Sequence, residues 1–390
     1  MKRGKMSITE MTRRERIMAA TNKKRADKLP FMHSWSGHQS GSAERECRNR
    51  GAGTKGGGST YLSKMHGVDV TETQAMSSGE VVRRRTFSTP VGSVYEDEKR
   101  WPGSGEWEGS NSWRKNSWRN VEPWKINRLI KGPEDYKVVK YMVENTEYTP
   151  YYLPIEQAID WVGDDGIAVG GLPSSPLQML TIHWIGSEGG SFFIHHAKYP
   201  DLVDDLYRAI SKSYEPLYEI VAKSPATVIN LDENIDGVLI SPKLFQKYVM
   251  PSYEKEAEIL HKHGKLMASH LDGRLDVLKD LIAKTPLDIV EAFHPPPMGD
   301  LPLGEALSLW KDKVIWLGFP GSVYSLGPEA VKNHTLDLLR EIGSGDRLVI
   351  EMNTENYEPN DNLLMLTSVL ENADLPLTKE KIDRIERSLA

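Results

Sequence analysis

The sequence predicts an α/β protein whose main body is a (β/α)8 barrel, and two observations support this class. From residue 164 onward, short apolar runs of β-type residues alternate with longer amphipathic stretches that have helical spacing. A repeated order of strand and helix indicates parallel strands joined by right-handed crossovers. Four such units follow residue 226 without the Gly-x-Gly-x-x-Gly turn of a dinucleotide-binding sheet, which favours a closed barrel.

The expected strands are apolar runs bounded by polar or turn residues, and the expected helices carry their apolar residues on one face. These features assign the barrel to residues 131–390, within a single structural domain overall. Strands are expected at 166–172, 226–232, 265–272, 288–294, 314–320 and 347–353. The clearest helices are expected at 242–264, 273–284 and 328–343.

Residues 1–130 are rich in Arg, Gly, Ser and Trp and are expected to form an N-terminal extension that packs on the barrel. The run FSTPVGSVY at 87–95 predicts a hairpin. The Gly-rich, basic run at 47–61 is interpreted as a flexible surface loop, because no GxxxxGK[ST] sequence supports phosphate binding. Five tryptophans at 101–124 have a spacing that fits neither a strand nor a helix. This Trp-rich loop is expected to pack on the barrel or to contact an aromatic ligand or a partner protein.

Composition excludes several classes of protein. The formal net charge of −6 and the pI near 6.0 leave no basic surface for nucleic acid. Cys47 is the only cysteine, which excludes a disulfide scaffold and a zinc ribbon, so a bound metal must use histidine and carboxylate ligands. The charged N-terminus is not followed by an apolar run, and no apolar stretch reaches the roughly 18 residues that span a membrane. We therefore expect a cytoplasmic protein.

The carboxyl ends of the strands, where such barrels carry their active sites, are unusually polar here. His270 and Asp272 are two residues apart at the end of one strand, so both side chains are expected to face into the barrel mouth. With Glu355 after a later strand, they would give a catalytic zinc ion three ligands and leave one coordination position open. Glu291 is the reserve ligand. The alternatives are that His270 is satisfied within the core and that Asp272 caps the following helix.

Three further polar residues, Asn230, Asp232 and Asn234, accompany the end of the strand at 226–232. We expect Asn230 and Asp232 to act in catalysis and Asn234 to bind substrate, with all three facing the mouth, because buried polar groups need partners. The alternative is that Asp232 and Asn234 order their own turn.

Four segments resemble the uroporphyrinogen decarboxylase superfamily, and together they cover most of the chain from about residue 85 to the end. SPKLFQKYVMPSYEKEAEILHKHGKLMASHLDGRL is similar to the segment in which a helix leads into a strand bearing His-x-Cys-Gly or His-x-Asp-Gly. VEAFHPPPMGDLPLGEA resembles the next strand and loop, and TPVGSVYEDE with KGPEDYKVVKYMVENTEY resembles the N-terminal extension. The resemblance implies a (β/α)8 barrel and one of two chemistries, namely decarboxylation of porphyrinogen acetates or zinc-dependent methyl transfer to or from a corrinoid protein.

Departures from the superfamily pattern favour the second chemistry. The segment FMHSWSGHQSG at 31–41 lacks the arginine of the RQAGRY type with which true decarboxylases grip substrate carboxylates. The thiol methyltransferases of the superfamily hold zinc with His-x-Cys and a later Cys, whereas Asp272 and either Thr354 or Glu355 stand at those positions here. Histidine and carboxylate ligands leave the cation harder than thiolates do, and therefore better matched to oxygen.

The resemblance and the ligand types together predict the methyltransferase component of a corrinoid-dependent O-demethylase. The methyl group of a methoxylated aromatic compound would pass to the Co(I) of a corrinoid carried by a partner protein, with Zn2+ as Lewis acid on the ether oxygen. Tyr152, Trp184 and Phe293 are expected to line a flat apolar substrate pocket, although such residues also serve as core packing.

Several alternatives remain open at this point. One is methyl transfer from methylcobalamin to a thiol or folate acceptor, and another is a uroporphyrinogen decarboxylase-like decarboxylase. A third is a barrel that binds a corrinoid or a tetrapyrrole without catalysis. The expected partners are the corrinoid protein and a small methoxylated substrate, without nucleic acid or membrane, and a homo-oligomer is possible.

Overall fold

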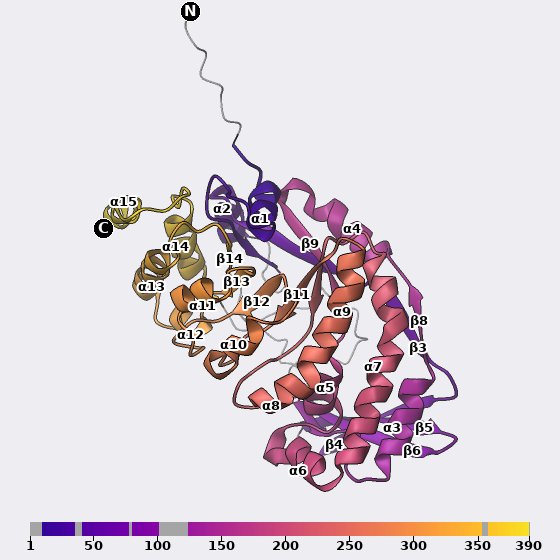
Figure 1. Cartoon of the computed structure of the whole chain (residues 1–390). Coiled ribbons are helices and arrows are strands. Elements are labelled where there is room, and N and C mark those ends of the chain that lie inside the picture. Colours follow the sequence, from indigo (N-terminus) through magenta and orange to yellow (C-terminus); the bar gives the residue numbers. More distant parts are fainter. Residues whose placement is uncertain (1–9, 36–40, 78–79, 101–123, 353–357, 390) are drawn as a thin grey trace, which may run out of the picture.

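Eight parallel strands close into a barrel, which confirms the expected fold class (Figure 1). The computed structural model describes residues 10–35, 41–77, 80–100, 124–352 and 358–389. The strands follow one another around the barrel in chain order, and the expected strands of the second half are all present within a few residues of their predicted ends. The barrel strands are β1 (Phe31–His33), β2 (Gly53–Gly58), β9 (Gly166–Leu172), β10 (Val228–Leu231), β11 (Leu266–His270), β12 (Ile289–Phe293), β13 (Val314–Gly318) and β14 (Leu348–Glu351).

The barrel begins close to the N-terminus, so the expected boundary at residue 130 is wrong. β1 pairs with both β14 and β2, with Phe31 opposite Ile350 and Met32 opposite Gly53. The first 130 residues therefore supply barrel strands as well as additional structure. The boundary was misplaced because β1 is only three residues long and β2 is nearly all glycine, so neither gives the apolar run typical of a barrel strand.

The Gly-rich run that was interpreted as a flexible loop contains β2, and its glycines have a packing reason. A Cβ atom at Gly56 would lie 2.7 Å from Val162, and one at Gly58 would lie 2.6 Å from the backbone of Pro154 and Ile155. Both neighbours belong to helix α4 (Leu153–Val162), which packs against the outer face of β2. Only glycine permits this close approach of helix and strand, so the correction follows from packing that the sequence pattern does not reveal.

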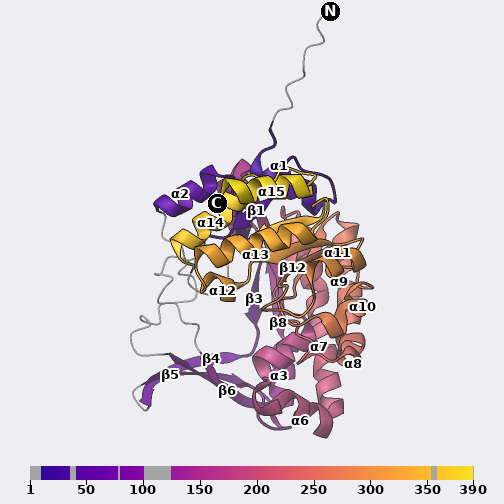
Figure 2. The ribbon, with the colours of Figure 1, turned by 90° about the vertical axis from the view of Figure 1, so that its left-hand side faces the viewer.

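The chain between β2 and β9 carries two further sheets. β3 (Tyr61–Met65) pairs antiparallel with β8 (Thr146–Pro150). β4 (Asp69–Ser77), β5 (Glu80–Thr89), β6 (Gly92–Arg100) and β7 (Trp124–Asn127) form a four-stranded antiparallel sheet. The turn between β5 and β6 confirms the predicted hairpin. Residues 101–123, which hold nearly all of the Trp-rich loop, lie outside the described residues. Figures 1 and 2 show this sheet at the end of the molecule opposite α1 (Arg13–Thr21).

Helices cover the outer surface of the barrel (Figure 1). The helix expected at 242–264 forms as α8, a π-helical turn at Phe245–Val249 and α9, and the one expected at 273–284 is reduced to a 3-10 turn and α10. None of the helices in the described ranges has both the length and the apolar character that crossing a membrane requires. The remaining helices are α2 (Ser42–Asn49), α3 (Asp135–Glu144), α5 (Pro176–Gln178), α6 (Ser191–Lys198), α7 (Pro200–Ala222), α8 (Pro242–Leu244), α9 (Met250–Lys262), α10 (Lys279–Ile282), α11 (Leu303–Leu309), α12 (Gly321–Tyr324), α13 (Pro328–Glu341), α14 (Asn360–Leu370) and α15 (Lys379–Ser388).

The interior of the barrel is apolar at the amino-terminal ends of its strands. Helix α1, which starts with a capping box between Thr12 and Glu15, places Ile17 and Ala20 against this interior. We call this the closed end of the barrel, because α1 covers it. Its cluster contains Ile17, Ala20, Met32, Ile167, Val228, Ala268, Ile289, Val314, Trp316 and Val349. A second and larger cluster includes the outward-facing residues of the strands and the helices that pack on them.

Candidate active site at the barrel mouth

Above the apolar layer, three charged side chains meet inside the barrel. Lys55 on β2 reaches across to β12 and β14, where its Nζ lies 2.5 Å from Glu291 Oε1 and 2.6 Å from Glu351 Oε1. Both carboxylate side chains are only 4% exposed, and Lys55 also lies over the Trp316 ring at 5.4 Å. Buried carboxylates require such a partner, because an uncompensated charge in the interior is strongly destabilising. Lys55 was not predicted as a site residue, because its strand was interpreted as a loop.

His270 stands at the end of β11, between two carboxylates. Its Nδ1 lies 2.6 Å from Glu291 Oε2, and its Nε2 lies 3.5 Å from Asp272 Oδ2. The structure therefore brings together His270, Asp272 and the reserve residue Glu291. Asp272 is not a helix cap, since the next helical turn begins only at Asp276. Its second oxygen, Oδ1, is buried and has no hydrogen-bond partner among the described residues.

The charges around His270 influence one another strongly. Burial opposes the positive charge of His270, but the carboxylates of Asp272 and Glu291 outweigh it and raise the pKa of the ring to about 11. Burial would raise the pKa of Glu291, yet Lys55 and His270 hold it well below its usual range. Glu351 faces fewer cations, so burial, together with the charge of Glu291, raises its pKa to about 7 despite the opposing effect of Lys55.

His294, after β12, lies beside the same group. A Cβ atom at Gly318 would lie 2.7 Å from His294 Nε2, so this glycine makes room for the ring. Burial lowers the pKa of His294, which favours the neutral imidazole. Its Nδ1 is buried without a hydrogen-bond partner in the described part of the chain.

Strand β10 contributes Asn230, which faces the barrel interior. Its register partners on the neighbouring strands are Gly171 and Ala268. The side-chain Oδ1 of Asn230 is buried and finds no partner among the residues that the structure describes. It is therefore available to a bound molecule, as are Asp272 Oδ1 and His294 Nδ1.

Asp232 and Asn234 lie in the loop after β10 and are exposed. The loop is ordered by another carboxylate, because Asp236 accepts hydrogen bonds from the backbone amides of Val238 at 2.6 Å and Arg274 at 3.1 Å. The turn-ordering role considered for Asp232 and Asn234 thus belongs to Asp236. Asp232 is near Tyr61, whose pKa is raised to about 12 by burial and by the nearby Tyr148 and Asp232.

The mouth is open on the side of β2 and β9. Lys55 and Gly57 are two residues apart on β2, and Gly171 pairs with the inward-facing Asn230, so both glycines face the interior. Both are nevertheless exposed. A Cβ atom at Gly171 would meet nothing within 4 Å. Among the described residues, this side of the mouth is therefore open to solvent.

The three aromatic residues predicted to bind substrate all make packing contacts. Phe293 is completely buried against Trp310, with ring centroids 5.6 Å apart. A bulge in β12, with Ala292 at φ 54°, turns Phe293 outward although Glu291 faces inward. The Tyr152 hydroxyl donates to the Ile220 carbonyl at 2.7 Å, and Trp184 packs against the outer hydrophobic cluster. Phe293 is thus part of the core, whereas Tyr152 and Trp184 are half-buried beside it.

The third expected zinc ligand, Glu355, lies outside the described residues. Within the described ranges, no three His, Cys, Asp or Glu side chains are placed so that they could hold a metal ion. Of the three expected ligands, His270 and Asp272 lie among the described residues. Glu291 is less suited to be a ligand than expected, because both of its oxygens are already engaged by Lys55 and His270.

A second buried polar group lies behind the site and supports its loops. Glu233 accepts a hydrogen bond from the Ser175 amide at 2.9 Å and contacts the hydroxyls of Tyr253 and Ser269. Ser269 directly precedes His270, so this group ties β11 to the loops after β9 and β10. Nearby, burial and the charge of Glu233 raise the pKa of Glu256 to about 8.

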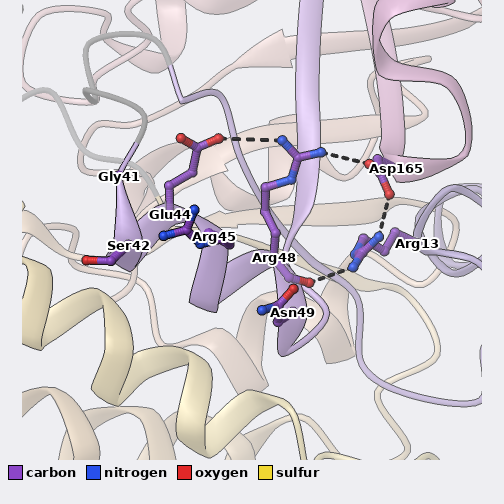
Figure 3. A pocket seen from close by; sticks show the side chains of 8 residues that line it. All are labelled: Arg13, Gly41, Ser42, Glu44, Arg45, Arg48, Asn49 and Asp165. Carbon is purple, nitrogen blue, oxygen red and sulfur yellow. Dashed lines mark hydrogen bonds and ion pairs between the residues drawn. The ribbon is translucent and has the colours of Figure 1, made fainter.

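A cavity of about 530 Å³ lies away from the residues described so far, and Figure 3 shows the side chains that line it. It lies beside α2 and includes Arg13, Arg48 and Asp165, and Asp165 directly precedes β9 at the amino-terminal end of the barrel. Asp165 binds both arginines, at 2.7 Å from Arg48, and Arg13 also donates to the Arg48 carbonyl at 2.6 Å (Figure 3). These contacts connect α1, α2 and the start of β9. In barrels of this kind, residues at the amino-terminal ends of the strands contribute to stability rather than to catalysis.

Comparison with known proteins identifies a related architecture. No family model and no curated protein matches the sequence. Among solved structures, a methyltransferase from Methanosarcina mazei is similar with a TM-score of 0.54 and 12% sequence identity, over 97% of this chain and 100% of that one. At this identity the likeness establishes a shared fold, which agrees with the closed eight-stranded barrel.

Proposed function

We propose that this chain is a methyltransferase that demethylates a methoxylated aromatic compound and passes the methyl group to the Co(I) of a corrinoid carried by a partner protein. The observation that carries the proposal is the His270–Asp272 pair, which faces the open mouth of a barrel whose fold is shared with a methyltransferase. Catalytic sites of such barrels lie at this end of the strands.

We propose that His270 and Asp272 bind a zinc ion at the mouth. The 3.5 Å between His270 Nε2 and Asp272 Oδ2 is long for a strong hydrogen bond, whose usual length is about 2.7–3.2 Å. Two ligands of one tetrahedral zinc ion, each about 2.0–2.2 Å from it, lie about 3.3–3.6 Å apart. The unpartnered Oδ1 of Asp272 adds a donor atom with no other use among the described residues. Glu355 would complete the set.

A bound zinc ion would supply a Lewis acid that stabilises negative charge on the ether oxygen. In the reaction, the bond between the methyl carbon and the ether oxygen breaks, and that oxygen keeps the electron pair and leaves as a phenolate. Co(I) provides the electron pair for the new carbon–cobalt bond and becomes methyl-Co(III). Phenolate is a better leaving group than an aliphatic alkoxide, so an aryl methyl ether requires less stabilisation from the protein.

The side chains of this chain hold the substrate and the ligands in place. Glu291 fixes the ring of His270 through Nδ1, as carboxylate partners of ligating histidines do. Asn230 directs its free Oδ1 toward the interior and accepts a hydrogen bond from a polar ring substituent. Asp232, exposed at the rim, orients the substrate or the corrinoid protein. The open side at Gly57 and Gly171 admits the aromatic ring.

Optical measurement of cobalt methylation tests the proposal. The purified chain is incubated with Zn2+, a Co(I) corrinoid and, in turn, methoxyarenes, methanol and methyl thiols. We expect methyl-Co(III) to form fastest with a methoxyarene. Faster turnover of methylcobalamin with a thiol than of any methoxyarene with Co(I) would assign the reverse direction of transfer instead.

A further inference from the structure

We infer that the outer edge of strand β4 is a dimer interface, at which β4 pairs antiparallel with β4 of a second copy of this chain. β4 stands at one edge of the four-stranded sheet and pairs only with β5 among the described strands. All nine of its residues are exposed. Figure 2 shows the strand at the end of the molecule away from α1. The inference is independent of the reaction proposed above.

The two edges of this sheet differ in how they are protected. A strand edge presents unpaired backbone N–H and C=O groups, which proteins usually protect by short length, lysine, proline or a bulge. At one edge, β7 is four residues long, carries Lys125 and shifts its register against β6. At the other edge, β4 is nine residues long, contains neither lysine nor proline, and pairs with β5 in an unbroken register. An edge of this second kind either aggregates or is covered by a partner strand.

The sequence of β4 complements itself. When a twofold axis relates two antiparallel strands, residues at equal distances before and after the residue on the axis lie opposite each other. With Thr73, the middle residue of β4, on the axis, all nine residues are paired. Val70, which is 49% exposed, then faces Met76 of the second copy, which is 68% exposed. Glu72 faces an uncharged Gln74. The remaining pairs are Asp69 with Ser77, Thr71 with Ala75, and Thr73 with its own copy.

Strand β5 extends the apolar match on both sides of the axis. Within the chain, Val70 pairs with Phe87 and Met76 pairs with Val81. The dimer would therefore align four apolar side chains in a row across four strands, and the axis would repeat this row. Phe87 belongs to the hydrophobic core, so each row continues the core into the interface. Cross-strand pairs of this kind stabilise a sheet.

Neighbouring registers match less well. With Glu72 on the axis, this carboxylate would lie directly opposite its own copy, and like charges in that position are destabilising. With Gln74 on the axis, Met76 would face Glu72, and Val70 would have no partner within the strand. The register centred on Thr73 thus uses the whole strand and matches both its apolar and its charged residues. This match of β4 with itself identifies a second copy as the partner.

Substitutions of Gln74 test the pairing, because its two neighbours differ in charge. Within the chain it pairs with Arg83, whereas across the axis it would face Glu72. Gln74→Glu should therefore weaken the dimer about 2–30-fold, since the like-charge pair occurs twice. The same variant should not lower the stability of the single chain, because the new carboxylate lies beside Arg83. Gln74→Lys should tighten the dimer and should not raise the stability of the single chain. Damage to the fold cannot produce this opposition.

Cysteine substitutions test the register, because the native Cys47 is buried. Opposite residues of an antiparallel pair have Cα atoms about 4.5–5.5 Å apart, within the range of about 4.4–6.8 Å that disulfides span. Thr73→Cys should therefore give a covalent dimer on mild oxidation. Thr71→Cys is the matched control on the same face, because the two thiols would be four residues, or roughly 13–14 Å, apart along the strands. The double variant Thr71→Cys with Ala75→Cys should cross-link again.

Sedimentation velocity of the whole chain over about 1–100 µM, the range in which small interfaces dissociate, measures the dimer. We expect a reversible shift from the 44.0 kDa of one chain toward twice that mass. Thermal unfolding is recorded for each Gln74 variant, and electrophoresis without reductant detects the cross-links. A chain that stays monomeric, or that forms only larger aggregates, would overturn the inference. So would a dimer that ignores both Gln74 substitutions, or in which Thr71→Cys cross-links as readily as Thr73→Cys, because its interface would then lie elsewhere.

Discussion

The two ends of the barrel interior differ in polarity: the closed end is apolar, and the mouth is charged. At the closed end, α1 and the strand starts bury apolar side chains such as Ile17, Ile289 and Val349, all at most 1% exposed. At the mouth, the same strands present Lys55 and Glu291 as charged, mutually paired groups. Ile289 and Glu291 are only two residues apart on β12, so the interior changes from apolar to charged within one step of the strand.

This difference separates stability from chemistry within one barrel. Burial of the closed end lowers the free energy of the fold and requires only matching shapes. The charged layer contributes less to stability, since two buried carboxylates and a buried lysine must first lose their hydration. Such groups are retained where they serve a reaction, and perturbed pKa values in an open mouth are typical of functional sites. The following changes test this separation, from the largest expected effect to the smallest.

Removal of the central imidazole should have the largest effect. His270→Ala is expected to abolish Zn2+ binding and to lower the rate of methyl transfer by at least about 1000-fold, because the Lewis acid is lost with its ligand. The thermal unfolding midpoint should also fall, because Glu291 and Asp272 lose the cationic partner that lies between them. Metal analysis and cobalt methylation measure both outcomes. His261→Ala, on the outer helix α9 in contact with Asp288, is the control and should leave both unchanged. Full zinc content in His270→Ala would contradict the assignment.

A substitution at the closed end should lower stability and leave metal binding unchanged. Ile289→Ala removes a completely buried side chain and is expected to lower the free energy of unfolding by about 2–5 kcal/mol, because a cavity replaces packed methyl groups. The metal affinity of the folded fraction should be unaltered. Urea unfolding followed by tryptophan fluorescence gives the first quantity, and dye competition gives the second. A loss of affinity equal to that of a mouth variant would show that the two ends are not independent.

Glu256 gives a pH-dependent prediction. Its pKa is raised from 4.5 to about 8 by burial and by the charge of Glu233, so the folded protein holds a proton that the unfolded chain releases. The contribution of this group is therefore lost progressively as pH rises from about 4.5 to about 8 and is constant above that range. Glu256→Gln keeps the neutral form and should gain stability relative to the unaltered protein over this window, by up to about 4 kcal/mol at pH 8. A difference that does not change between pH 5 and pH 8 would refute the expectation.

The smallest effect concerns room for the substrate. Gly171→Leu should fill the open side of the mouth and raise KM for a methoxyarene about tenfold, roughly 1.4 kcal/mol, with little effect on methanol. Its stability should not fall, because a Cβ atom there meets nothing within 4 Å. The adjacent Gly170 is the contrast, since a Cβ atom would lie 2.9 Å from Ile229, so Gly170→Ala should lower stability instead. An equal increase of KM for the methoxyarene and for methanol would contradict the placement of the aromatic ring beside Gly171.

The sequence predicts the second half of this molecule better than the first. Strands β9 to β14 are continuous apolar runs, because both faces of a barrel strand are covered, and periodicity detects them. β2 escapes detection because its neighbours demand glycine, as the contact between Gly58 and the start of α4 shows. Pattern alone carries no information about which helix will approach so closely.

The site residues follow the same division. His270 and Asp272 are predictable, since their spacing places them together at one strand end. Phe293 is not, because a bulge at Ala292 reverses the alternation on which the prediction depends. Lys55 is missed together with its strand, and its partners Glu291 and Glu351 are distant in the sequence. Lys55 meets its partners only because the barrel closes, and the pattern of neighbouring residues in the sequence does not show which distant strands face each other.

The seam at which the barrel closes also affects how the chain can fold. β1 pairs with β14, and Phe31 lies opposite Ile350, nearly the whole length of the chain away. During synthesis β1 therefore emerges long before its last partner, and one of its edges stays unpaired until almost all of the protein has left the ribosome. Such distant pairing slows folding and leaves a strand edge open to other chains. Expression at low temperature or with chaperones should therefore raise the yield of this protein more than that of barrels whose first strands lie closer in sequence to their last.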